Sequence, residues 1–170
     1  GLWRHQGETE PQRLAGVGFS AEGFDISSYY RRNPDSFDPR VAFMFKGIGK
    51  DELIGDFGYH GGGAAGNELD RADPALGTPP HALIVATSEK HTDLYMVVNE
   101  EILINHPGMS GNDHPLVRAD MVFFETPNGG AVFSTGSIAY GASLPWNDYK
   151  NNIAKLTTNV LKRFANPKPF

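Results

Sequence analysis

A run of small residues at positions 61–66 leads directly into a charged stretch, and Glu68 is the first carboxylate in it. Glycine and alanine leave space beside the backbone, so a carboxylate placed there can meet a substrate or a water molecule. Partial burial beside such a small-residue wall raises the pKa of a carboxyl group and suits it to act as a general base. The alternative is a solvated glutamate that pairs with Arg71, which contributes only tenths of a kcal/mol. Residue type alone favours this alternative, because most glutamates are solvated.

Three of the small residues, Gly61, Gly63 and Gly66, also satisfy the pattern G-x-G-x-x-G. This pattern binds a dinucleotide only where it follows a strand and opens a helix. Neither context is indicated, since two glycines interrupt residues 55–60 and Pro74 follows soon after the pattern. No Gly-Lys-Ser/Thr follows, which excludes a P-loop. Nucleotide binding is therefore disfavoured, and the stretch is interpreted as a loop that allows close approach and carries a carboxylate.

The six histidines do not form a metal signature, because the sequence has neither His-Glu-x-x-His nor a close pair on one helix face. We therefore predict no metal ligand within this chain. His60 lies beside the glycine run and His81 opens an apolar segment, so position makes both candidates for a substrate site. A histidine chosen by position alone is more often structural or exposed. Three others lie in loops and are weaker candidates: His91, His106 and His114.

Composition narrows the class of protein and its compartment. The chain of 170 residues fits a single domain, 1–170, or the C-terminal part of a larger α/β domain. A formal net charge of -5 argues against a nucleic-acid partner, which needs a basic face. The absence of cysteine excludes disulfides, zinc ribbons and thiol nucleophiles. We find no apolar run of about 18 residues and no signal peptide, so we expect no membrane partner and a cytoplasmic location.

In the first half of the chain, the sequence patterns for the helices and strands that position the charged stretch are weak. The pattern predicts a short strand at residues 14–19 and a loop at residues 20–37. Asp38-Pro39 suits the cap and first position of a helix. Its apolar face would be formed by Val41, Met44, Phe45 and Ile48. Residues 50–80 are then predicted to be a glycine-rich connection that carries Glu68.

Stronger local patterns follow this connection. Residues 81–87 form a continuous apolar run, which is typical of a strand buried on both faces. A further strand is predicted at residues 93–98. The many Asn, Pro and Gly residues at 104–116 predict a long loop.

The C-terminal part combines a hairpin and a helix. Asn128-Gly129 between apolar runs at residues 120–125 and 131–139 predicts the hairpin. A helix is predicted at residues 148–164, with an apolar stripe made by Ile153, Leu156, Val160, Leu161 and Phe164. Together the elements predict an α/β fold with a layered mixed sheet flanked by helices.

Several longer strings occur in order along residues 1–166: "GVGFSAEGFD", "SSYYRR", "DPRVAFMF", "IGDFG", "GGGAAGNELDRADPALGTPPHALI", "RADMVFFETPNGGAVFSTGSIA" and "NNIAKLTTNVLKRF". Together they resemble the C-terminal region of the large (beta) subunit of N,N-dimethylformamidase. The resemblance implies hydrolysis of N-substituted formamides to formate and an amine, within a class I glutamine-amidotransferase-like α/β fold. It also implies a small amide substrate, the remainder of a large subunit, a small helical partner subunit and an oligomer.

The chemistry of that family uses a mononuclear iron held by two tyrosines and a glutamate, and the resemblance places these ligands upstream of the matching region. A further glutamate near the iron belongs to the string that here contains Glu68. The resemblance therefore implies that Glu68 accepts a proton from water activated by iron and passes it to the leaving amine. Neighbouring residues would give the substrate room or fix the loop by ionic hydrogen bonds. This supporting set is His60, Gly63, Asn67, Asp70, Arg71 and His81.

Two other functions stay open, because α/β folds host many activities. The first is a non-catalytic interaction or assembly module of the same fold. The second is a small-molecule domain that binds an anion at the glycine-rich loop.

Overall fold

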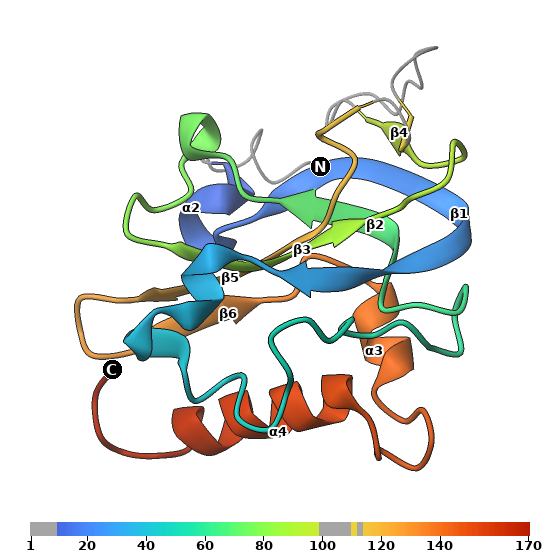
Figure 1. The fold of residues 1–170 in the computed structure, drawn as a ribbon. Coiled ribbons are helices and arrows are strands. Elements are labelled where there is room, and N and C mark those ends of the chain that lie inside the picture. Colours follow the sequence, from blue (N-terminus) through green and yellow to red (C-terminus); the bar gives the residue numbers. More distant parts are fainter. Residues whose placement is uncertain (1–9, 99–109, 112–113) are drawn as a thin grey trace.

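The computed structural model describes residues 10–98, 110–111 and 114–170, which form a curled antiparallel sheet with helices packed against it (Figure 1). The sheet order is β2-β1-β3-β5-β6, and β4 pairs with β1. Each of these strand pairs is antiparallel. The α/β class is therefore confirmed, but the expected mixed sheet is antiparallel in the described part, and the glutamine-amidotransferase-like relationship stays a prediction. The strands are β1 (Gly18–Arg32), β2 (Ala65–Arg71), β3 (Leu83–Glu89), β4 (Met96–Val97), β5 (Asp120–Glu125) and β6 (Ala131–Ser134).

β1 is the longest strand, and the predicted loop at residues 20–37 was wrong over most of its length. The strand predicted at 14–19 was wrong at its start, because α2 (Pro11–Ala15) precedes β1 and ends at Gly16 in the left-handed region (φ 78°). One part of β1 pairs with β2 and its last four residues pair with β3. This polar segment is a strand because it pairs with strands on both sides. The β propensity of its own residues does not account for it.

The segment after β1 packs as predicted but is not an α-helix. Two short 3-10 helices, η1 (Pro34–Phe37) and η2 (Pro39–Val41), are followed by turns. Asp38 caps η2 as expected, accepting a hydrogen bond from the Arg40 N–H at 2.8 Å. The Asn159 side chain donates to the carbonyl oxygens of Met44 and Lys46, both at 3.0 Å, so a distant residue fixes these turns. The predicted apolar set is nevertheless buried: Val41, Met44, Phe45 and Ile48.

The strands with strong local signals are confirmed. Adjacent residues Val85 and Ala86 of β3 are both fully buried, so both faces of this strand are covered as predicted. β5 and β6 form the predicted hairpin, but β6 ends at Ser134 and the short helix α3 (Ala139–Ser143) begins where the strand was expected to end. The strand predicted at residues 93–98 is reduced to β4.

The C-terminal helix α4 (Asn152–Phe164) is confirmed but begins later than predicted. Residues 147–149 have positive φ values and cannot continue a right-handed helix. Asn151 caps α4, because its side chain accepts a hydrogen bond from the Ala154 N–H at 2.8 Å. A third 3-10 helix, η3 (Pro74–Leu76), follows β2. Most of the loop predicted at 104–116 lies outside the described residues.

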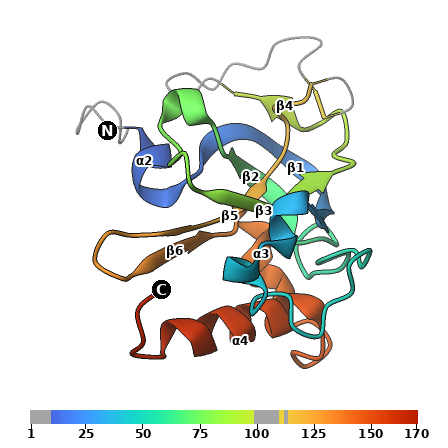
Figure 2. The same ribbon diagram turned by 60° about the vertical axis from the view of Figure 1, so that its left-hand side comes forward.

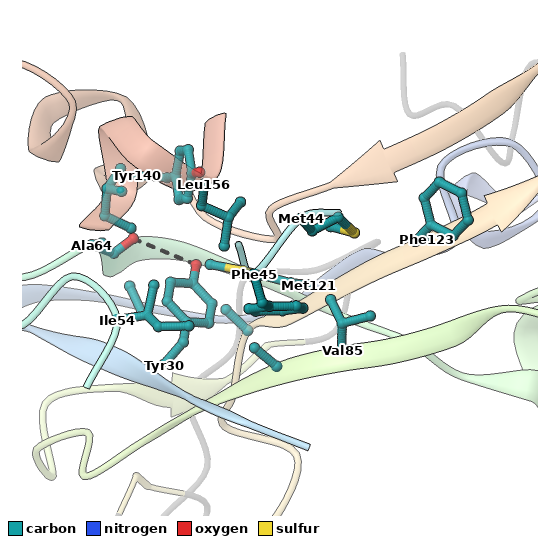
Figure 3. Close-up of a cluster of buried hydrophobic side chains, with 14 of the residues drawn as sticks. Tyr30, Met44, Phe45, Ile54, Ala64, Val85, Met121, Phe123, Tyr140 and Leu156 are labelled. Atoms are coloured by element: carbon teal, nitrogen blue, oxygen red, sulfur yellow. Dashed lines mark hydrogen bonds between the residues drawn. The ribbon is translucent and has the colours of Figure 1, made fainter. Parts of the chain in front are cut away.

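The main core lies between the sheet and α4, which runs along one side of the molecule (Figures 1 and 2). Figure 3 shows Tyr30 of β1 among core side chains, with its hydroxyl near the Ala64 carbonyl oxygen at 3.4 Å. A smaller cluster on the other side of the sheet contains Val17, Ala72, Val122 and Phe124. Within the described residues, no helix is long and apolar enough to cross a membrane.

Candidate functional site

Glu68 lies on a strand and not on a flexible connection. The connection predicted at residues 50–80 was wrong here, because β2 pairs with the first part of β1. Glu68 is opposite Glu22 in the strand register, whereas the neighbouring Leu69 is fully buried. The Glu68 side chain is exposed, and its carboxylate has no hydrogen bond or ion pair among the described residues. The partial burial expected of a base is therefore not supplied by the part of the chain that the structure describes.

The glycines before β2 allow two segments of this chain to touch each other. A Cβ added to Gly66 would collide with the Ser27 hydroxyl, and a Cβ added to Gly63 would collide with the Ser28 carbonyl oxygen. The two alanines between these glycines are fully buried in the core. The space beside Gly63 and Gly66 is thus filled by β1, whereas the sequence suggested that it would admit substrate.

Asn67 is held in an unusual backbone conformation directly before Glu68. Its φ angle is 64°, in the left-handed region that residues other than glycine rarely adopt. The Nε2 of exposed His60 lies 2.7 Å from the Asn67 side-chain oxygen. The Asn67 N–H donates to the hydroxyl of fully buried Tyr95 at 3.3 Å. The structure therefore brings His60 and Asn67 together, and adds Tyr95, whose sequence signal was an aromatic residue in a predicted strand. The role of these residues at a substrate site stays a prediction.

Asp70 lies two residues after Glu68 and is half-buried. Burial, followed by the negative charge of Glu68, raises the pKa of Asp70 to about 6. No hydrogen bond reaches its carboxylate within the described part of the chain. Arg71 forms its ion pair with Asp73, so the pair of Arg71 with Glu68 that the sequence offered as the alternative is not formed. The site thus consists of two carboxylates on one strand, Glu68 and Asp70, neither of which is paired with another described residue.

His81 lies apart from this pair. Its Nε2 is 3.0 Å from the Glu125 carbonyl oxygen, and its ring meets the Phe124 ring edge-on at 6.1 Å between centroids. These contacts are at the C-terminal end of β5. The opposite end of β5, at Asp120, is the end that approaches β2, because the Asp120 carboxylate accepts the Ala72 N–H at 2.9 Å. The structure therefore does not bring His81 to Glu68.

The described side chains do not form a metal site. No group of three or more His, Asp or Glu residues among them is arranged to hold a metal ion. The buried tyrosines are engaged within the protein. The Tyr30 hydroxyl donates to the Thr135 carbonyl oxygen at 2.8 Å, and the Tyr140 and Thr157 hydroxyls lie 2.8 Å apart. The described residues thus do not fit a resident iron with ligands from this chain alone.

The fold and the site together define an α/β domain that presents carboxylates on a rigid strand beside strained backbone. Comparison with known proteins shows the family of this domain. The model of the family described as "N,N-dimethylformamidase beta subunit-like, C-terminal" matches residues 1–152. The chain therefore belongs to this family, as its sequence motifs indicated.

Two curated relatives support the assignment. The chain is 51% identical over 158 residues to the N,N-dimethylformamidase beta subunit of an Alcaligenes species. It is 49% identical over 158 residues to the N,N-dimethylformamidase beta subunit of Paracoccus aminophilus. In both cases the match covers 93% of this chain but 21% of the relative. The chain thus spans about a fifth of the length of these relatives.

Proposed function

We propose that this chain is part of an amidohydrolase that hydrolyses N-substituted formamides or similar small amides to a carboxylate and an amine. The observation that carries the proposal is the family match, together with an exposed Glu68 on β2 that pairs with no described residue. The activity belongs to the complete enzyme, because the chain spans only a fifth of its relatives. The remaining groups of the active site would come from residues outside this chain.

In the proposed reaction Glu68 acts as the general acid–base. Its carboxylate accepts a proton from the water that attacks the amide carbonyl carbon. It then returns the proton to the amide nitrogen as the C–N bond breaks, which gives a neutral amine and a carboxylic acid. Glu68 suits this task because no cation or hydrogen-bond donor of the described chain occupies its oxygens. Its place on β2 also fixes its backbone more firmly than a loop would.

Iron is proposed for the complete enzyme on the strength of the family resemblance alone. Its ligands would lie outside this chain, because the described side chains do not form a three-ligand set. We therefore assign no residue of this chain as a ligand and derive no step from the metal.

The partners and compartment are proposals of the same kind. Phe24 and Ile26 of β1 are 81% and 63% exposed and follow Glu22 at two-residue spacing. Large apolar side chains exposed in this way mark a surface that other protein covers. We propose that the remainder of the large subunit covers this face, within a cytoplasmic oligomer that includes a small helical subunit. The same exposure is what favours the second candidate function, a non-catalytic assembly module.

Substitution of Glu68 separates the two functions. In the complete enzyme, Glu68→Gln should lower kcat by at least about 100-fold, the lower end of the usual effect of acid–base catalysis. The matched control is Glu22→Gln, which changes the residue directly opposite on β1 and should leave most activity intact. Iron content and subunit composition are measured on each variant. Near-normal turnover of Glu68→Gln would exclude Glu68 from the reaction and favour the assembly module.

A further inference from the structure

Asn67 lies at one of the two irregularities in the pairing of β1 with β2, the other being between Phe19 and Ala21. Gly23 pairs with Asn67 and Ser28 pairs with Ala65, so five steps along β1 correspond to two steps along β2. Irregularities of this kind re-aim side chains and occur beside active sites. The backbone of Asn67 lies in the left-handed region (φ 64°), which is uncommon outside glycine although asparagine adopts it more readily than most residues.

Tyr95 holds Asn67 from the inside of the molecule. Its hydroxyl accepts the Asn67 N–H at 3.3 Å, and its side chain is fully buried. The ring lies against Gly23, where an added Cβ would come 2.6 Å from the ring, so only glycine fits there. The ring also packs against His91, with 4.8 Å between ring centroids. The position of the hydroxyl is therefore fixed by packing.

His60 holds Asn67 from the outside. Its Nε2 lies 2.7 Å from the Asn67 side-chain oxygen, which is a short distance for this hydrogen bond. Asn67 is thus restrained at its backbone by Tyr95 and at its side chain by His60. Glu68 itself has no hydrogen bond among the described residues. The restraints on Asn67 consequently reach Glu68 through the backbone, which sets where the Glu68 side chain leaves β2.

We propose that Tyr95 and His60 are positioning residues that fix the left-handed conformation of Asn67 and thereby aim the Glu68 carboxylate at the substrate. The inference rests on the proposed function, because it gives Tyr95 and His60 a role only if Glu68 takes part in the reaction. Tyr95 and His60 act through Asn67 and do not contact the substrate. Loss of either restraint lets β2 relax and moves the carboxylate, which lowers the rate of the chemical step and leaves substrate affinity unchanged.

The test uses the complete enzyme and the variants Tyr95→Phe and His60→Gln. Tyr95→Phe removes one hydroxyl from a buried ring, and His60→Gln changes an exposed side chain, so both variants should fold. Each should lower kcat about fivefold or more, the equivalent of one hydrogen bond, with little change in KM. The matched control is Tyr140→Phe, which also removes a buried hydroxyl, bonded to Thr157 at 2.8 Å. This control should lower the melting temperature and leave kcat unchanged.

A double-substitution cycle shows whether Tyr95 acts through Glu68. In enzyme that already carries Glu68→Gln, the further change Tyr95→Phe should not lower residual turnover again. If Tyr95→Phe lowers kcat equally in the wild-type enzyme and in the Glu68→Gln variant, the proposal is overturned. It is also overturned if Tyr95→Phe and His60→Gln both keep the wild-type kcat while Glu68→Gln is inactive. Full activity of Glu68→Gln would instead overturn the proposed function itself. The two failures are therefore distinguishable.

Discussion

Acidification is expected to destabilise the chain through His91, which is 2% exposed. Its Nε2 lies 2.7 Å from the Ser88 hydroxyl oxygen. That oxygen also accepts the Ala119 N–H at 2.7 Å, which leaves the hydroxyl hydrogen available to donate to a neutral imidazole. The Nδ1 of His91 has no hydrogen-bond partner among the described residues. Burial therefore lowers the pKa of His91 to about 4.

The direction of the pH effect follows from this lowered pKa. The ordinary value is 6.5, so the folded chain prefers the neutral ring more strongly than the unfolded chain does. The corresponding stability is fully present above pH ~6.5 and is lost as the pH falls through ~4. A difference of roughly 2.5 pKa units corresponds to ~3 kcal/mol, of which about 2 kcal/mol is lost between pH 7 and pH 5.

The assay is urea unfolding of the 170-residue chain at pH 7 and pH 5, followed by tryptophan fluorescence. His91→Gln keeps an acceptor for the Ser88 hydroxyl but does not titrate. Between the two pH values, the wild-type chain should lose about 2 kcal/mol more of its unfolding free energy than this variant does. His81→Gln, at an exposed histidine, serves as the control and should behave as the wild type. Equal losses in the wild type and His91→Gln would refute the reasoning.

Two further substitutions test other parts of the structure. Burial and the charge of Glu68 raise the pKa of Asp70 to about 6, so its ionised form costs stability that is absent below pH ~4 and complete above pH ~6. Asp70→Asn should therefore raise the free energy of unfolding by about 2 kcal/mol at pH 7 but hardly at pH 4, and a gain independent of pH in urea unfolding would contradict this. Asn151→Ala removes the cap of α4, where the side chain accepts the Ala154 N–H at 2.8 Å and donates to the Trp146 carbonyl oxygen at 2.6 Å. In thermal unfolding, Asn151→Ala should lower the free energy of unfolding by about 1–2 kcal/mol. The control Asn166→Ala, beyond the end of the helix, should lower it less, and equal losses would argue against the cap.

The sequence predicted those elements whose partners are close along the chain. The β5–β6 hairpin was found because Asn128-Gly129 and both strands lie within one short window. The core-facing part of the apolar stripe of α4 was found because helical spacing shows in a single segment, and Ile153, Leu156 and Val160 are buried as predicted. The predicted stripe was wrong at Leu161 and Phe164, which are exposed at the C-terminal end of the helix. β1 was missed because its partners, β2 and β3, lie more than 30 residues away and its own residues are polar. Pairing over such distances leaves no local pattern to detect.

The candidate site was predicted only in part for the same reason. Glu68 was chosen because small residues are followed there by charged ones. His60, Asn67 and Asp70 were chosen because they are close to Glu68 in the sequence. The true neighbours of the glycines could not be foreseen, because Ser27 and Ser28 come from a strand that was taken for a loop. Tyr95 also approaches Asn67 from outside the local segment.

The carboxylates of β2 also admit a purely structural explanation, since charged side chains on a terminal strand prevent association of sheet edges. β2 is indeed the last strand in the sheet order. Its outer edge, however, is partly occupied by the chain itself, because Leu69 forms a bridge with Ser137 and the Asp70 N–H donates to the Gly136 carbonyl oxygen at 2.8 Å. Edge protection also requires only an exposed charge such as Glu68.

Edge protection does not explain Asp70, which is half-buried, unpaired among the described residues and next to a second negative charge. Such a carboxyl group destabilises the fold at neutral pH, as its raised pKa indicates. Carboxyl groups with strongly raised pKa values gather at functional sites, where proton transfer needs them. Edge protection alone therefore does not explain the position of Asp70 beside Glu68, and acid–base chemistry on β2 stays a proposal for activity measurements to test. If Asp70→Asn is more stable at pH 7 and also less active in the complete enzyme, stability has been exchanged for function at this strand.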